Sequence, residues 1–281
     1  MPEFSIREAR SSDRRQVAEL AALTWRWGDY LMSVWRRWLN SPNGDLLVAE
    51  ADGKIVGIMY VEYRPAGEAY LAGARVHPRW RRMGVATALT IECLERARSR
   101  GRNLATLATS VRNEAAQRLA QKLGFRLRAK LIRARAGPKA GAGELDVRPV
   151  EPHECQAVHR WLVERVGRPI KFDWYSYSTL TPEDVRTYAE EQFAFAVGRY
   201  EGVALWQPAA DRQMMIMLDA IYGTASAVKQ LGLAARRDAK GLGYQVVYGQ
   251  VASSDETLRG LKAAGFRWPK TRGTLIYEKP L

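Results

Sequence analysis

Four residues between positions 79 and 84 could together bind a phosphorylated ligand. Arg79, Arg81 and Arg82 supply positive charge, and Gly84 follows them at the start of a helical stretch. Glycine lets the backbone approach a ligand closely. The first amides of a helix have no partner inside the helix, and with the helix dipole they favour an anion. The segment therefore predicts a diphosphate site, although a basic helix start with a turn glycine is the plainer interpretation.

We call residues 79–86 the arginine-glycine loop. The elements predicted before and after it place it between a strand and a helix. The pattern indicates a strand over 68–76 and a helix with an apolar face over 85–100. A buried strand is expected at 103–108 and a second amphipathic helix at 113–123, which a glycine ends. This order of strands and helices predicts an α/β unit in which the two strands pair in parallel.

A run of glycine, proline and small residues over 137–144 predicts an interdomain linker. At 281 residues the chain is also long for one domain. We therefore expect two domains, at 1–136 and 145–281.

The two halves show the same order of predicted elements, including a strand hairpin over 46–62 and another over 193–206. Ile6 and Val147 are 141 positions apart, and so are Gly124 and Gly265; the turn glycines at 53 and 202 differ by 149. A near-constant offset indicates a duplicated domain, although each match is short.

The second half lacks the arginine-glycine loop. After an apolar strand at 214–221, residues 222–226 contain one glycine and no arginine. Ser254 stands where Asn113 stands in the first half, and Asp255 and Glu256 add negative charge beside it. Because a diphosphate needs positive charge, we expect this domain to hold no cofactor and to complete the substrate cleft or serve a structural role.

Charge and composition narrow the function classes. Residues 1–137 carry 25 Lys or Arg against 13 Asp or Glu, whereas the remainder carries 19 against 17. A basic half suits an anionic cofactor, an acidic substrate or nucleic acid, and a solvated basic surface is the plainer explanation. The sequence shows no long apolar run and no signal-peptide core at its N-terminus, which favours a cytoplasmic protein. The cysteines and histidines form no metal signature or disulfide framework; they are Cys93, Cys155, His77, His153 and His159.

Residues 4–135 resemble the GCN5-related N-acetyltransferase (GNAT) superfamily. Arg81-Arg82-Met83-Gly84-Val85-Ala86 fits the family's pyrophosphate motif, and Val76-His77-Pro78 before it is also typical. Asn113-Glu114-Ala115-Ala116 and then Lys122-Leu123-Gly124-Phe125 resemble the family's next signature at the expected spacing. The resemblance implies an α/β (α+β) fold of two GNAT-like domains. Each would have a mixed, mostly antiparallel sheet, flanked by helices, with a splayed central parallel pair.

The resemblance also implies roles for single residues. Backbone groups of the splayed strand, at Ala74, Arg75 and Val76, would pair with the pantetheine arm of acetyl-CoA. An amide in this gap would polarise the thioester carbonyl and stabilise the oxyanion. Asn113 would bond to the pantetheine arm or order the attacking group; it is also suited to be the N-cap of its helix, and we expect both roles.

One residue departs from the family's pattern. The family often has a tyrosine near the end of the helix at 113–123, which protonates the departing thiolate; Ala120 stands there instead. Water could protonate the thiolate, and Tyr70 is a substitute candidate.

The attacking amine must lose a proton, and a carboxylate near the open end of the sheet would accept it. Glu68 shares a strand face with Tyr70 because the two lie two positions apart, and Glu62 ends the adjoining strand. We favour Glu68 over Glu62, although a solvated strand-end carboxylate is the plainer interpretation of each.

Five aromatic residues occur where GNAT folds border the acceptor site: Trp25, Trp27, Tyr30, Trp35 and Trp38. Helical spacing over 30–38 predicts core or interface packing for some of them, and lining of the acceptor site is the alternative. Residues 172–177 are a comparable aromatic segment in the second half.

Together these features predict an acetyl-CoA-dependent N-acetyltransferase that transfers an acetyl group to a primary amine by direct attack on the thioester. Acetyl-CoA would be the cosubstrate, without a metal, and the acceptor a small molecule or a peptide; a monomer or homodimer is expected, with no membrane partner. An acetyl-CoA-binding regulatory or structural protein with little transfer activity is the alternative. Nucleic-acid binding is a third hypothesis, which we do not favour because the sequence has no basic motif interleaved with aromatic residues.

Overall fold

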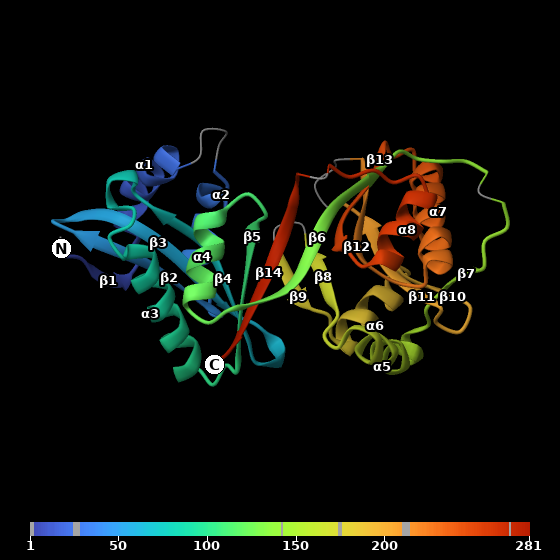
Figure 1. Cartoon of the computed structure of the whole chain (residues 1–281), viewed down its shortest axis with the longest axis horizontal. Helices are drawn as coiled ribbons and strands as arrows, with labels where there is room; N and C mark the ends of the chain where they lie inside the picture. Colours follow the sequence, from blue (N-terminus) through green and yellow to red (C-terminus); the bar gives the residue numbers. More distant parts are fainter. Residues whose placement is uncertain (1–2, 25–28, 142, 174–175, 210–213, 270) are drawn as a thin grey trace. The chain divides into compact units, whose positions relative to one another are not determined.

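The computed structural model describes residues 3–24, 29–141, 143–173, 176–209, 214–269 and 271–281. Two compact units divide the chain. Unit 1 comprises Met1–Thr109, Asn113–Arg128 and Ile276–Leu281, and unit 2 comprises Ser110–Arg112 and Ala129–Leu275. Each unit is a sheet covered by helices, as Figure 1 shows.

The sheet of unit 1 has the strand order β1-β2-β3-β4-β5, with the last part of β14 beside β5. Neighbours from β1 to β4 are antiparallel, and β4 and β5 are parallel. This confirms the predicted mixed, mostly antiparallel sheet with a central parallel pair. The strands are β1 (Ser5–Glu8), β2 (Gly44–Ala51), β3 (Lys54–Tyr63), β4 (Glu68–Val76), β5 (Leu104–Ser110) and β14 (Gly273–Pro280).

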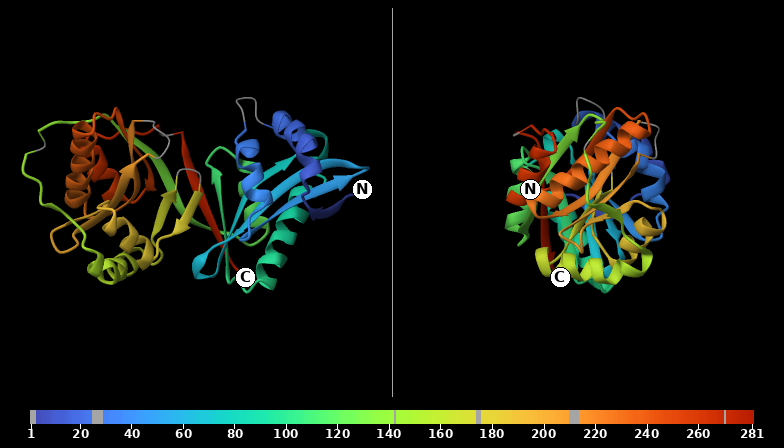
Figure 2. Two further views of the ribbon diagram at one scale, coloured as in Figure 1. Left: turned by 180° about the vertical axis from the view of Figure 1, so that it is seen from behind. Right: turned by 90° about the vertical axis from the view of Figure 1, so that its right-hand side faces the viewer.

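Helices cover both faces of this sheet (Figures 1 and 2). On one face, Leu20 and Trp35 of the first two helices pack against Ile58 of β3. On the other, Gly57 leaves room for Val85 of the third helix, because a Cβ at Gly57 would lie 2.7 Å from the Val85 side chain. The helices are α1 (Arg14–Thr24), α2 (Leu31–Leu39), α3 (Val85–Ser99) and α4 (Glu114–Lys122).

The sheet of unit 2 has the strand order β6-β13-β12-β11-β10-β7. In the described residues β12 and β13 pair in parallel, and the other neighbouring strands pair antiparallel. The strands are β6 (Arg126–Ala136), β7 (Val147–Pro149), β10 (Ala194–Val197), β11 (Gly202–Pro208), β12 (Met215–Gly223) and β13 (Val246–Ala252), and a separate hairpin is formed by β8 (Ile170–Asp173) and β9 (Ser176–Thr179).

Strand β11 shows how unit 2 builds a core on each face. Ala204 and Trp206 pack with one pair of helices, and Val203 and Leu205 pack with the other pair. Alternation of apolar residues to opposite faces is what a strand buried on both sides requires. The helices are α5 (Cys155–Val166) and α6 (Pro182–Glu190) on one face, and α7 (Ala225–Gly241) and α8 (Asp255–Ala263) on the other.

Several predicted elements have the expected bounds. Strand β4 spans Glu68–Val76, as the pattern predicts. The turn between β2 and β3 has positive φ at both Asp52 (48°) and Gly53 (71°), which is the geometry that an Asp-Gly hairpin turn needs. The compact units differ from the predicted ranges 1–136 and 145–281 in where the last strand of each range belongs. Ala129–Ala136 group with unit 2, and Ile276–Leu281 group with unit 1.

Candidate active site

A bulge interrupts β4 close to its C-terminal end. The register with β3 shifts between Ile58 and Tyr60, so two residues of β4, Gly73 and Ala74, lie opposite one residue of β3. Gly73 has φ +70°, and a Cβ there would lie 2.5 Å from the Trp38 ring. Glycine is therefore strongly favoured at this position, and the bulge redirects the backbone at the residues predicted to meet the pantetheine arm.

The parallel pair separates at the same level of the sheet. Its register runs from Glu68 opposite Leu104 to Leu71 opposite Leu107, and no further pair of these two strands is formed in the described residues. Beyond that point β4 continues to Val76 and β5 to Ser110. The predicted splay is thus present, and it exposes backbone groups of β4 toward the gap.

The connection from β4 to α3 includes the arginine-glycine loop. The connection contains a short 3-10 turn (Pro78–Trp80), followed by positive φ at Arg82 (65°) and Gly84 (87°). The first backbone bond of α3 runs from the Ala88 amide to the Gly84 carbonyl, and no side chain among the described residues caps the helix. The amides of the first helical turn are consequently available to an external acceptor.

Arginines surround these amides. Arg79, Arg81 and Arg82 are exposed, and none of them forms an ion pair with a carboxylate in the part of the chain that the structure describes. Free amides, the positive end of a 15-residue helix and three cations form a site whose charge matches a diphosphate. The helix begins where the sequence predicts, and diphosphate binding by these residues stays a prediction.

Asn113 caps α4. Its side-chain oxygen accepts a hydrogen bond from the Ala116 amide at 3.2 Å. The predicted capping role is therefore confirmed, and the side-chain NH2 group is left to bind elsewhere.

Glu62, Glu68 and Tyr70 lie together, around Arg64. The guanidinium is 2.7 Å from Glu62 Oε2 and 3.6 Å from Glu68 Oε1, and it lies 4.0 Å from the centroid of the Tyr70 ring. Glu68 is buried and accepts a 2.6 Å hydrogen bond from Thr106. This cluster is at the paired end of β4, about 25 Å along the strand from Val76 at the usual rise per residue. The structure brings the three proton-transfer candidates together but does not place them beside the loop.

An ion pair that sequence reasoning missed holds the bulge in place. Arg75 Nε donates to Asp29 Oδ2 at 2.6 Å and Nη2 donates to Oδ1 at 2.8 Å. Burial acts to lower the pKa of Arg75, but the Asp29 carboxylate outweighs burial and raises it. Nothing in the spacing of these residues, 46 positions apart, links them.

The described residues of the aromatic segment over 25–38 contribute mainly to the core. Trp35 and Trp38 are buried, and Trp38 stacks on Tyr60 with ring centroids 4.5 Å apart. Tyr30 is 41% exposed and meets the edge of Trp38. Trp25 and Trp27, like Trp174 and Tyr175 of the second half, lie outside the described residues.

The corresponding helix start in unit 2 is closed by the protein itself. Thr224 caps α7 by accepting from the Ala227 amide, and the Glu256 carboxylate accepts from the Ala225 amide. These two groups take the positions that an anion would need. A carboxylate there also repels phosphate.

The gap beyond the parallel pair of unit 2 is also filled. The Tyr222 hydroxyl bonds to both the amide and the carbonyl of Ile170 on β8, each at 2.7 Å. Tyr177 on β9 donates to Gln250 of β13. The β8–β9 hairpin thus binds the ends of β12 and β13 where a splayed pair would otherwise be open.

No described helix is both long and apolar enough to span a membrane. No cluster of three or more histidine, cysteine or acidic residues suited to a metal ion occurs in those residues either.

Comparison with known proteins agrees with this geometry. Residues 10–125 match the sequence model of the acetyltransferase (GNAT) family. A mycothiol acetyltransferase of Paenarthrobacter aurescens is 33% identical over 91 residues, which are 30% of this chain and 28% of that protein. The matched segment therefore spans less than a third of that relative.

Solved structures share the fold over nearly the whole chain. A GCN5-related N-acetyltransferase from Sphaerobacter thermophilus has a TM-score of 0.64 at 19% identity, covering 99% of this chain and 95% of the other. One from Kribbella flavida has a TM-score of 0.55 at 13% identity, with 99% and 71% covered. The chain thus has the mixed α/β fold of these proteins.

Proposed function

We propose that the chain is an acetyl-CoA-dependent N-acetyltransferase with one active site, in unit 1. The observation that carries this proposal is the uncapped start of α3, which follows a bulged, splayed strand and is surrounded by three arginines without carboxylate partners in the described residues. The family match over residues 10–125 supports it.

Different residues of unit 1 would bind different parts of the cosubstrate. The amides from Arg82 to Ala86 and the side chains of Arg81 and Arg82 would bind the diphosphate. Backbone groups of Ala74–Val76 would pair with the pantetheine arm, with the Asn113 NH2 group facing the same arm. An amide at the bulge would stabilise the oxyanion that forms when a primary amine attacks the thioester carbon and the thiolate leaves.

Proton transfer is assigned to the cluster around Arg64. We propose Glu68, with Glu62 second, as the group that takes the proton from the amine, and Tyr70 as a source of the proton for the thiolate. These residues lie far along β4 from the arginine-glycine loop. Their proposed roles in proton transfer should therefore be tested first, by substitution.

Unit 2 is proposed to be a second copy of the same domain without cofactor. Gly124 and Gly265 both have φ +82°, and each is followed by a phenylalanine whose amide bonds back to the helix, Phe125 to Ala120 and Phe266 to Leu261. The order of elements from β10 to β14 repeats that from β2 to β6.

Calorimetry with acetyl-CoA, followed by measurement of coenzyme A release with a panel of amines, tests the proposal. We expect one acetyl-CoA per chain and release with at least one amine, the acceptor of the mycothiol acetyltransferase being one member of the panel. Binding without release for any amine would favour the regulatory alternative. Absence of binding would refute the site itself.

A further inference from the structure

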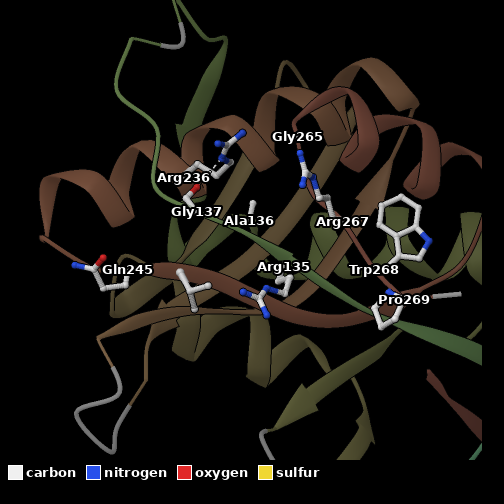
Figure 3. A pocket seen from close by; sticks show the side chains of 10 residues that line it. Arg135, Ala136, Gly137, Arg236, Gln245, Gly265, Arg267, Trp268 and Pro269 are labelled. Atoms are coloured by element: carbon white, nitrogen blue, oxygen red, sulfur yellow. Dashed lines mark hydrogen bonds between the residues drawn. The ribbon is translucent and has the colours of Figure 1, made fainter. Parts of the chain in front are cut away.

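A hollow of about 540 Å³ lies within unit 2, outside every residue assigned so far (Figure 3). It is bordered by the end of β6, the start of β13, the C-terminal half of α7 and the segment after α8. Its principal side chains are those of Arg135, Arg236, Gln245, Arg267 and Trp268.

Arg135 and Arg267 lie opposite each other in a backbone pair. The Arg135 amide donates to the Arg267 carbonyl at 3.0 Å and the Arg267 amide donates to the Arg135 carbonyl at 2.9 Å. Side chains of such a pair lie on the same face, and like charges directly opposite each other destabilise a sheet. The described residues include no carboxylate that is ion-paired with either of them. Within those residues the pair therefore has no counter-charge.

The third arginine is oriented toward the same hollow by carbonyl groups. Arg236 Nε donates to the Gly137 carbonyl at 2.8 Å, the bond drawn in Figure 3, and Nη1 donates to the Ala264 carbonyl at 2.5 Å. Burial without an acidic neighbour lowers its pKa. Gly265 makes room for this guanidinium, since a Cβ there would lie 2.5 Å from Nη1. A fixed guanidinium without a carboxylate is arranged for an anion that comes from solution.

We propose that this arginine pocket, defined by Arg135, Arg236, Arg267 and Trp268, binds a nucleoside di- or triphosphate. Three guanidinium groups suit the oxygens of a short phosphate chain, and the half-buried Trp268 offers a surface on which a base can stack. The volume is that of a small-molecule site, which favours a free nucleotide over a nucleic-acid strand. The pocket shares no residue with the arginine-glycine loop of unit 1.

Titration calorimetry of the full chain with ATP, GTP and pyrophosphate tests this site. The measurements are made on Arg81→Ala/Arg82→Ala protein, so that the loop in unit 1 contributes little. We expect nucleotide binding to persist there and to weaken at least about tenfold on adding Arg236→Gln or Arg135→Gln, since hydrogen bonds to charged groups are strong. Arg160→Gln, which removes an exposed charge of α5 outside the pocket, is the matched control and should leave the affinity unchanged.

The ring contribution is tested separately. Trp268→Leu should weaken ATP binding and leave pyrophosphate binding unchanged. If Arg236→Gln lowers the melting temperature, its effect on binding is not interpreted. The Arg135→Gln variant, which replaces an exposed side chain, then tests whether the pocket binds the nucleotide. The proposal is overturned if nucleotides do not bind, if their binding is lost with Arg81 and Arg82, or if a short RNA binds through the pocket arginines more tightly than any mononucleotide.

Discussion

The Arg148 guanidinium binds the Glu154 carboxylate through both Nη atoms, at 2.7 and 2.9 Å. Arg7 and Asp13 make the same two bonds at the same two distances, 141 positions earlier in the chain. In each case the carboxylate also accepts the amide three residues before it, at the short 3-10 turn that leads into the first α-helix of its unit. A shared offset in such a specific contact supports the proposed duplication beyond the short sequence matches.

Glu154 should titrate far below an ordinary glutamate. The hydrogen bond from Arg148 is the main cause that lowers its pKa, to about 2. A carboxylate with a depressed pKa stabilises the fold above its unfolded pKa and loses that contribution as the pH falls through the folded pKa. We therefore expect the stability difference between wild type and Glu154→Gln to be constant at neutral pH and to fade between about pH 4.5 and pH 2. Carboxyl carbon-13 NMR checks the pKa directly, and Arg148→Gln should raise it; a pKa that is the same in both proteins would contradict the assignment.

Arg81→Ala and Arg82→Ala should each weaken acetyl-CoA binding, because each removes a guanidinium from the proposed diphosphate site. A loss of roughly tenfold per arginine is expected from the strength of charge-assisted hydrogen bonds. Calorimetry measures the affinity, and Arg98→Ala, an exposed arginine further along α3, is the control for loss of charge alone. Equal effects of all three substitutions would mean that the loop does not hold the diphosphate.

Gly73→Ala should destabilise unit 1 more than a left-handed backbone alone explains. Gly101 has nearly the same φ, +68° against +70°, but a Cβ at Gly101 meets nothing within 4 Å. Gly101→Ala should therefore cost about 1 kcal/mol, which is the backbone strain, and Gly73→Ala roughly 1–3 kcal/mol more, from overpacking against Trp38. Urea unfolding of the two variants gives the difference. Equal costs would show that the Trp38 ring moves away freely.

Asp29→Ala should destabilise the protein by about 3–5 kcal/mol, because it leaves the buried Arg75 guanidinium without its carboxylate. The double variant Asp29→Ala/Arg75→Met removes both charges and should recover much of that loss. Thermal or urea unfolding of the wild type, of the single variants Asp29→Ala and Arg75→Met, and of the double variant completes a double-mutant cycle. A double variant as unstable as Asp29→Ala would show that packing, rather than the ion pair, is what the site loses.

Glu68→Gln should lower turnover by about 10²–10⁴-fold if Glu68 is the general base, with little change in acetyl-CoA affinity. Glutamine can still accept the Thr106 hydroxyl, so the fold should be retained. Glu62→Gln is the matched comparison on the neighbouring strand. The pH dependence of kcat distinguishes a lost base from a local distortion, and unchanged turnover would remove Glu68 from the mechanism.

The parts that local patterns determine could be predicted. The bounds of β4, the Asp52-Gly53 turn and the start of α3 follow from alternation, turn chemistry and a glycine before an apolar helix. The arginine-glycine loop was found in the same way, because all of its groups are contiguous in the chain.

The parts of the fold and of the site that depend on contacts between residues distant in the sequence could not be predicted. Asp29 and Arg75 are joined only by the fold, and the bulge at Gly73 is visible only once Trp38 is seen above it. The β8–β9 hairpin closes the gap of unit 2 through hydrogen bonds of tyrosine hydroxyl groups, which the spacing of these residues in the sequence does not predict. The arginine pocket combines residues from positions 135, 236 and 267, each of which alone resembles an ordinary surface arginine.

The assignment of the last strands has a consequence for dividing the chain into fragments. Strand β5 has the end of β14 as its neighbour in unit 1, and β14 lies far along the sequence from the rest of that unit. A fragment of the first 140 or so residues would thus expose an uncovered strand edge, which is prone to pair with other chains. We expect unit 1 to complete its sheet only when β14 is present. A fragment that stops at the predicted linker should accordingly aggregate, and adding the C-terminal segment as a separate peptide should improve its solubility.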